Sequence, residues 1–69
     1  MYELYHRDSV KNTDTLLGTF ETVEELRKAA SDYLEKIKFK SYYWRGWSKG
    51  GIHWIDYGSH TKFFYWKEA

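Results

Sequence analysis

The chain has 69 residues and a formal net charge of +1, with no cysteine and no proline, and aromatic residues make up 22% of it. This length corresponds to one domain with a small core, and the lack of cysteine excludes a disulfide framework and a thiolate zinc site. Aromatic side chains bury a large area each, so their packing is the main source of stability that we expect.

The sequence carries no signal for a membrane or for export. No apolar run approaches the length of a membrane-spanning helix, and residues 1–9 (MYELYHRDS) alternate in polarity, unlike a signal peptide. We therefore expect a cytoplasmic protein that does not bind membranes.

Positive charge and tryptophan are concentrated in the second half of the chain. Residues 1–35 carry four basic and eight acidic side chains, whereas residues 36–69 carry seven basic and two acidic ones and all four tryptophans. A positive surface attracts anionic polymers, although so small a net charge predicts weak and salt-sensitive binding.

Two strands are predicted at the start of the chain. Residues 2–7 (YELYHR) alternate in polarity, with even-numbered side chains on one face and odd-numbered ones on the other. Residues 15–20 are the expected partner strand. Residues 8–14 (DSVKNTD) are rich in Asp, Asn, Ser and Thr, which is typical of a solvated connection.

A helix is predicted over residues 23–38. Thr22 and Glu25 have the spacing of a capping box, in which the hydroxyl accepts from an early helical N–H and the carboxylate reaches back to the N–H of the cap residue. Apolar side chains then recur at helical spacing between positions 26 and 37, so one stripe of the helix faces a core.

The pattern after residue 39 predicts three more strands. Residues 40–47, 52–57 and 61–67 form an aromatic-rich meander, with turns at residues 48–51 and 58–59. The element order is therefore ββαβββ. Because a right-handed crossover carries the third strand past the first, we expect a single α+β domain over residues 1–69 with a five-stranded antiparallel sheet in the order 2-1-3-4-5 and the helix packed on one face.

The predicted hairpin registers divide the side chains of these strands between two faces. They pair Trp47 with Ile52 and Trp54 with Phe63. The face with the charged side chains is expected to be solvent-exposed, and the helix is expected to cover the other. The covered face is predicted to hold Tyr42, Trp44, Ile55, Tyr57, Phe64 and Trp66. The outer face is predicted to hold the candidate binding residues Tyr43, Arg45, Trp47, Trp54, Phe63, Tyr65 and Lys67.

A contiguous exposed aromatic patch of this size indicates a binding surface. Our leading hypothesis is association with protein, either a second copy to give a homodimer or a different chain, since a small domain gains stability from a partner. The alternative is single-stranded nucleic acid, with bases stacked on the rings and Arg or Lys on the phosphates, against which Asp56 argues. A third interpretation is purely structural, with Arg45 stacked on Trp54.

The titratable residues do not suggest catalysis. His53 and Asp56 would point to opposite faces of one strand, which argues against a metal site that includes His60. Ser59 and His60 are adjacent in sequence and lack a third group to orient the imidazole. No phosphate-binding loop, nucleophile elbow or dinucleotide fingerprint is present. We expect a non-enzymatic binding module without a metal or cofactor.

Two segments resemble a group of known proteins. Residues 18–34 (GTFETVEELRKAASDYL) and 54–66 (WIDYGSHTKFFYW) resemble small uncharacterised proteins encoded by phages and prophages of Gram-positive bacteria. The resemblance covers most of the chain. It implies a small cytoplasmic accessory protein that binds host or phage macromolecules, and it assigns no catalytic residue.

Overall fold

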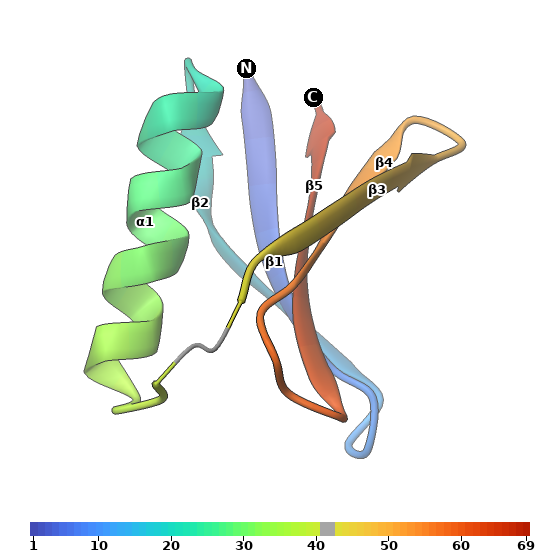
Figure 1. The fold of residues 1–69 in the computed structure, drawn as a ribbon. Helices are drawn as coiled ribbons and strands as arrows, with labels where there is room; N and C mark the ends of the chain where they lie inside the picture. Colours follow the sequence, from blue (N-terminus) through green and yellow to red (C-terminus); the bar gives the residue numbers. More distant parts are fainter. Residues whose placement is uncertain (41–42) are drawn as a thin grey trace.

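The computed structural model of the protein describes residues 1–40 and 43–69. Figure 1 shows the elements in chain order: β1 (Tyr2–Asp8), β2 (Thr13–Phe20), α1 (Val23–Lys36), β3 (Arg45–Lys49), β4 (Ile52–Asp56) and β5 (Lys62–Glu68). The predicted ββαβββ order and the class, an α+β fold with a five-stranded antiparallel sheet and one helix, are confirmed. Within the described residues, no helix is long and apolar enough to cross a membrane.

The strand order was predicted incorrectly. It is β2-β1-β5-β4-β3, so β5 and not β3 pairs with β1. This pairing sets Glu3 opposite Lys67 and Asp8 opposite Lys62, two pairs of opposite charge. It also puts the fully buried Phe64 on a central strand, whereas every residue of β3 is exposed. Both orders keep the sheet antiparallel and the crossover right-handed, so burial and charge pairing decide between them.

The register of the β3–β4 hairpin differs from the predicted register by two residues. Gly50 and Gly51 form its turn with φ values of 59° and 80°, and Trp47 therefore pairs with Trp54, not with Ile52. Positive φ at both central residues is the geometry of a type I′ turn, which suits glycine. The strand itself begins at Arg45 instead of residue 40.

The connection between β4 and β5 shifts the second register by the same amount. Trp54 pairs with Tyr65, not with Phe63 as predicted, and Gly58 has a φ of 103° in a connection longer than a tight turn. Both shifts are even, so every side chain of these strands stays on its predicted face. Tyr42, predicted on the covered face, lies outside the described residues.

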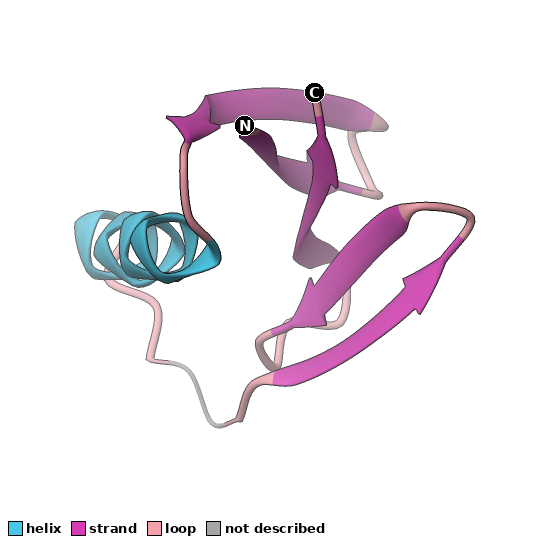
Figure 2. Cartoon of the chain, turned by 90° about the horizontal axis from the view of Figure 1, so that it is seen from above, coloured by secondary structure: helices cyan, strands magenta, loops and turns pink. Residues whose placement is uncertain are grey.

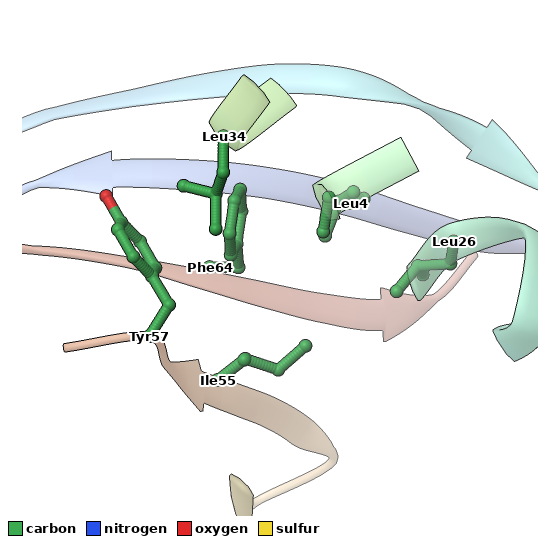
Figure 3. Close-up of a cluster of buried hydrophobic side chains, with 7 residues drawn as sticks. Leu4, Leu26, Leu34, Ile55, Tyr57 and Phe64 are labelled. Atoms are coloured by element: carbon green, nitrogen blue, oxygen red, sulfur yellow. The ribbon is translucent and has the colours of Figure 1, made fainter. Parts of the chain in front are cut away.

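The core lies between α1 and the concave side of the sheet (Figure 2). Leu26, Ala30 and Leu34 are spaced four residues apart, which forms one buried stripe along α1. Figure 3 shows the labelled side chains pointing into one shared space. The sheet contributes the buried apolar side chains of Leu4, Ile55 and Phe64, and Tyr57 adds a fourth from the residue after β4.

The start of α1 is capped largely as predicted. Thr22 has an extended backbone, and its hydroxyl oxygen accepts a 3.2 Å hydrogen bond from the Glu25 N–H. The Glu25 carboxylate accepts a 3.0 Å bond from the Thr22 hydroxyl, in place of the predicted bond from the Thr22 N–H. Glu24 and Glu25 in the first turn also favour the positive end of the helix dipole.

The end of α1 comes two residues earlier than predicted because the backbone turns at Lys38. Lys38 has a φ of 58°, in the left-handed region, and its N–H donates to the Glu35 carbonyl. The Phe39 N–H donates to the Leu34 carbonyl at 2.9 Å. This pair of bonds is a Schellman motif, and it turns Phe39 back so that its ring meets the Tyr57 ring edge-on at 5.0 Å.

Among the described residues, His6 is the one buried polar or charged side chain, with an exposed fraction of 6%. Its Nε2 lies 2.9 Å from the Tyr57 hydroxyl, and its ring packs against Tyr33 and Phe64. Burial lowers the pKa of His6 below the ordinary value, and the nearby Lys62 ammonium adds to this effect. The neutral imidazole is therefore the form that fits this core.

We predict that Leu26→Ala lowers the free energy of unfolding by about 3 kcal/mol, because Leu26 is fully buried and its loss leaves a cavity. The matched control is Leu16→Ala, since Leu16 is 51% exposed, and it should cost less than about 1 kcal/mol. Urea denaturation followed by circular dichroism measures both. Equal losses for the two variants would contradict the described core.

We also predict that stability falls as the pH decreases from about 6.5, because the unfolded chain then protonates His6 while the folded chain resists it. The slope from this one group is at most about 1.4 kcal/mol per pH unit. His6→Gln keeps a polar side chain but removes the part of the pH dependence of stability that comes from protonation of His6. Urea unfolding of both proteins between about pH 7.5 and 5.5 tests the prediction, since most carboxylates titrate below that range. Parallel pH profiles would refute the role of His6.

Candidate functional site

Four aromatic side chains form a row across the outer face of the sheet. The strand pairings set Tyr5 opposite Tyr65, Tyr65 opposite Trp54, and Trp54 opposite Trp47. The ring centroids of these successive pairs are 4.9 Å, 4.9 Å and 6.4 Å apart. We call these four residues the aromatic row. It crosses four of the five strands, β1, β5, β4 and β3, on the face opposite the core.

The rings of the aromatic row lie largely against one another. Tyr5 and Tyr65 are stacked with an interplanar angle of 9°, so each covers one face of the other. The Lys67 ammonium lies over the Tyr5 ring, 5.6 Å from its centroid. Trp54 is tilted against Tyr65 and meets Phe63 edge-on at 5.3 Å. At the end of the row, Trp47 is 48% exposed.

An acidic side chain anchors the β1 end of the row. Asp14 on β2 forms a 2.9 Å ion pair with Arg7 and accepts a 3.1 Å hydrogen bond from the Tyr65 hydroxyl. Burial and this hydrogen bond raise the pKa of Tyr65 to about 12. The Tyr65 hydroxyl is thus a neutral donor whose acceptor, Asp14, lies two strands away on β2, and this bond fixes the ring in the row.

A second ion pair lies at the β3 end. Arg45 is paired with Asp56 across the strands, with 3.4 Å between Nη2 and Oδ2, and its guanidinium lies over the Tyr43 ring at 5.7 Å. The predicted stacking of Arg45 on Trp54 was wrong, because the actual register sets Trp47 and not Arg45 opposite Trp54. The Tyr43 hydroxyl also donates to Asp56 at 3.4 Å.

The structure places the predicted binding residues in three linked groups. Trp47, Trp54, Phe63 and Tyr65 are in ring contact. Tyr43 and Arg45 contact each other beside Trp47, and Lys67 lies over Tyr5. Tyr5 was not among the predicted binding residues, because the predicted strand order put β3 and not β5 beside β1. The opposite charges of Glu3 and Lys67, which the observed pairing brings together, were the signal that could have found it.

A groove on the opposite side of β3 was also missed. Arg27 and Ser31 of α1 face Trp44, Gly46 and Ile55 across a hollow of about 300 Å³. An adjoining hollow of about 350 Å³ shares three of these residues, namely Arg27, Gly46 and Ile55. The main backbone contacts of α1 are with β1 and β2, and all five residues of β3 are exposed, so the helix leaves the inner side of β3 open.

The adjoining hollow contains a serine next to a histidine. Ser48 Oγ lies 2.6 Å from His53 Nδ1, and the His53 ring stacks on Trp66 at 3.9 Å. The predicted register did not set these two residues opposite each other, whereas the observed one does. A catalytic pair also needs a group that orients the imidazole. In the described part of the chain, no carboxylate forms a hydrogen bond with His53, so the pair ties β3 to β4 without the geometry of a nucleophile site.

The described residues also offer no metal site. Across residues 1–40 and 43–69, no group of three or more His, Asp or Glu side chains is arranged to hold a metal ion. His53 stacks on Trp66 while Asp56 binds Arg45 on the outer face, so these two residues lie on opposite sides of the sheet.

Comparisons of this chain with protein-family models, with curated proteins and with solved structures find no match. The geometry of the outer face and of the groove is therefore the basis for the functional proposals below.

We predict that two of the seven tyrosines, Tyr57 and Tyr65, ionise only near pH 12 in the folded protein. Tyr65→Phe should remove one of these late ionisations, and Asp14→Asn should move that of Tyr65 toward about 10, because it removes the charged acceptor. Tyrosinate absorbance during alkaline titration, with circular dichroism to confirm that the fold persists, measures this. Since the unfolded chain ionises first, stability should decrease above about pH 10. An unchanged titration of the Tyr65→Phe protein would contradict the assignment.

Proposed function

We propose that this chain is a non-enzymatic protein-association domain that binds through its outer sheet face, and that its partner on this face is a second copy of the chain. The observation that carries the proposal is the aromatic row, which spans four strands on the face that α1 does not cover. A small binding protein of phage or prophage origin, as the resemblance of residues 18–34 and 54–66 implies, is part of the same proposal.

The ring geometry favours a protein over a nucleic acid. Nucleobases bind such surfaces by stacking on open ring faces. Tyr5 and Tyr65 already stack on each other, and Trp54 is enclosed by Phe63 and Tyr65, so the row presents mostly ring edges and hydroxyl groups. Aromatic residues that combine an apolar body with a polar edge are enriched in protein interfaces.

The charges around the row also favour a protein partner. Arg7 and Arg45, two of the cations of this face, are each paired with an aspartate. A phosphate backbone would have to compete with those carboxylates, and its attraction to the face is reduced accordingly. Positive and negative groups alternate around the row, so two copies can face each other without strong net repulsion.

The size of the molecule is compatible with a dimer of this kind. A standard interface buries about 800 Å² on each partner. That is about one-sixth of the 4971 Å² of accessible surface of this chain, which one face of a five-stranded sheet can supply. Two sheets that pack face to face are a common arrangement in which aromatic side chains interdigitate.

Single-stranded nucleic acid is the second candidate, and one observation favours it. Trp47 is the most exposed ring of the row, and Arg45 and Lys49 flank it on the same strand face. A base stacked on Trp47 with phosphates on the two cations would be a small binding site of the kind that sheet-based readers use.

Sedimentation velocity over a hundredfold concentration range (about 5 to 500 µM) tests the dimer, and we expect dimers that persist at high salt because the contact is mainly apolar. Trp47→Ala should weaken the dimer at least about tenfold. Trp44→Ala is the matched control, since Trp44 is 45% exposed against 48% for Trp47 but stacks on Phe64 on the other face. It should leave the dimer unchanged.

A protein that stays monomeric throughout this range would overturn self-association. Trp fluorescence during titration with a single-stranded oligonucleotide then decides between the candidates. Saturable quenching that weakens steeply with salt would favour nucleic acid.

A further inference from the structure

The open edge of β3 is a surface distinct from the flat outer face of the sheet. We propose that β3 accepts an extended acidic peptide as an added strand, with two acidic side chains of the peptide at alternate positions facing Arg45 and Lys49. The peptide pairs with the backbone of β3 and meets the aromatic row only at Trp47, at the end of the row, so this inference does not rest on the proposed dimer.

The backbone of β3 is ready for such pairing. β3 is the outermost strand, pairs only with β4 among the described elements, and is exposed at all five residues. Because Lys49 and Ile52 flank a two-residue turn, alternate residues of β3 bond to β4. The N–H and C=O groups of Gly46 and Ser48 are therefore directed toward the free edge, where an extended peptide can pair with them.

The charges on β3 specify an acidic partner. Arg45, Trp47 and Lys49 occupy alternate positions, so all three side chains lie on the outer side of the strand. The complement on an added strand is an acidic, an aromatic or aliphatic, and a second acidic residue at alternate positions. Arg45 is paired with Asp56 at 3.4 Å, but its side chain is 73% exposed, and an ion pair this exposed is weak enough to be exchanged.

The same charges oppose pairing of β3 with a second copy of itself. A symmetric antiparallel pairing centred on Trp47 would set Arg45 of each copy opposite Lys49 of the other. Like charges directly opposite each other destabilise a strand pair, and natural edge strands use them to avoid association. Pairing of β3 with its own copy is therefore disfavoured, whereas pairing with a strand of opposite charge is favoured.

The groove on the inner side gives the peptide a second set of contacts. Gly46 has no side chain, so the hollow of about 300 Å³ between α1 and β3 opens directly beside the free edge. Trp44 and Ile55 line it with apolar surface, and Arg27 adds a cation. Side chains of the peptide that alternate with its acidic residues point into this groove, where apolar groups of moderate size fit.

The test is a fluorescence-anisotropy titration with a labelled peptide whose core reads Glu-Val-Tyr-Val-Glu, capped at both ends. We expect saturable binding that weakens with salt, and at least tenfold weaker binding of the charge-reversed peptide Lys-Val-Tyr-Val-Lys. The double variant Arg45→Glu/Lys49→Glu should instead bind the charge-reversed peptide more tightly than the acidic peptide. The control variant Lys11→Glu/Lys36→Glu makes the same change in net charge away from β3 and should keep the preference of the native chain.

Backbone methylation separates strand pairing from simple charge attraction. One acidic peptide carries N-methyl groups on both valines, and a second carries them on the tyrosine and the glutamates. An added strand directs only one of these two sets of N–H groups at β3. One methylated peptide should therefore bind at least tenfold more weakly than the unmethylated peptide, and the other should bind equally well.

Three results would each overturn the inference: no saturable binding of the acidic peptide, equal affinity of the two methylated peptides, or a charge preference that the β3 variant leaves unchanged. The dimer is measured without peptide, so the outcome of one experiment does not decide the other.

Discussion

The pairing of β5 with β1 is the constraint on which the rest of the structure depends. It extends over the full seven residues of both strands and joins the first and last elements of the chain within the sheet. Phe64 reaches the middle of the core through this pairing, and Tyr65 comes to lie beside Tyr5. The same pairing moves β3 to the outside of the sheet, which creates both the exposed end of the aromatic row and the free edge.

Local chemistry and side-chain alternation made much of this fold predictable. The cap at Thr22 and the apolar stripe of α1 follow from short-range spacing. The division of the last three strands between two faces survived two wrong registers, because alternation has a period of two and both errors were even. The end of the helix was not predictable in this way, since Lys38 adopts a left-handed conformation that sequence patterns assign to glycine or asparagine.

The strand order and the complete site required long-range information. Most of the aromatic row could be listed from the alternation of the last three strands, but Tyr5 joins it only when β1 lies beside β5. The crossover rule accepts either β3 or β5 next to β1. The matching charges on β1 and β5 could have decided the choice. The contact between Ser48 and His53 depended in the same way on the exact register.

The central position of the β1–β5 pair also determines how this chain can fold. The pairs run from Asp8 with Lys62 to Tyr2 with Glu68, so the paired residues are separated by 54 to 66 positions in a chain of 69. The β1–β2 hairpin and the β3–β4–β5 meander can form early because each contains only short connections, whereas β1 and β5 meet only when the chain ends come together. Loop closure of this kind is slow. We therefore expect the β1–β2 hairpin and the β3–β4–β5 meander to form first, and their docking through the β1–β5 pair to limit the rate of folding.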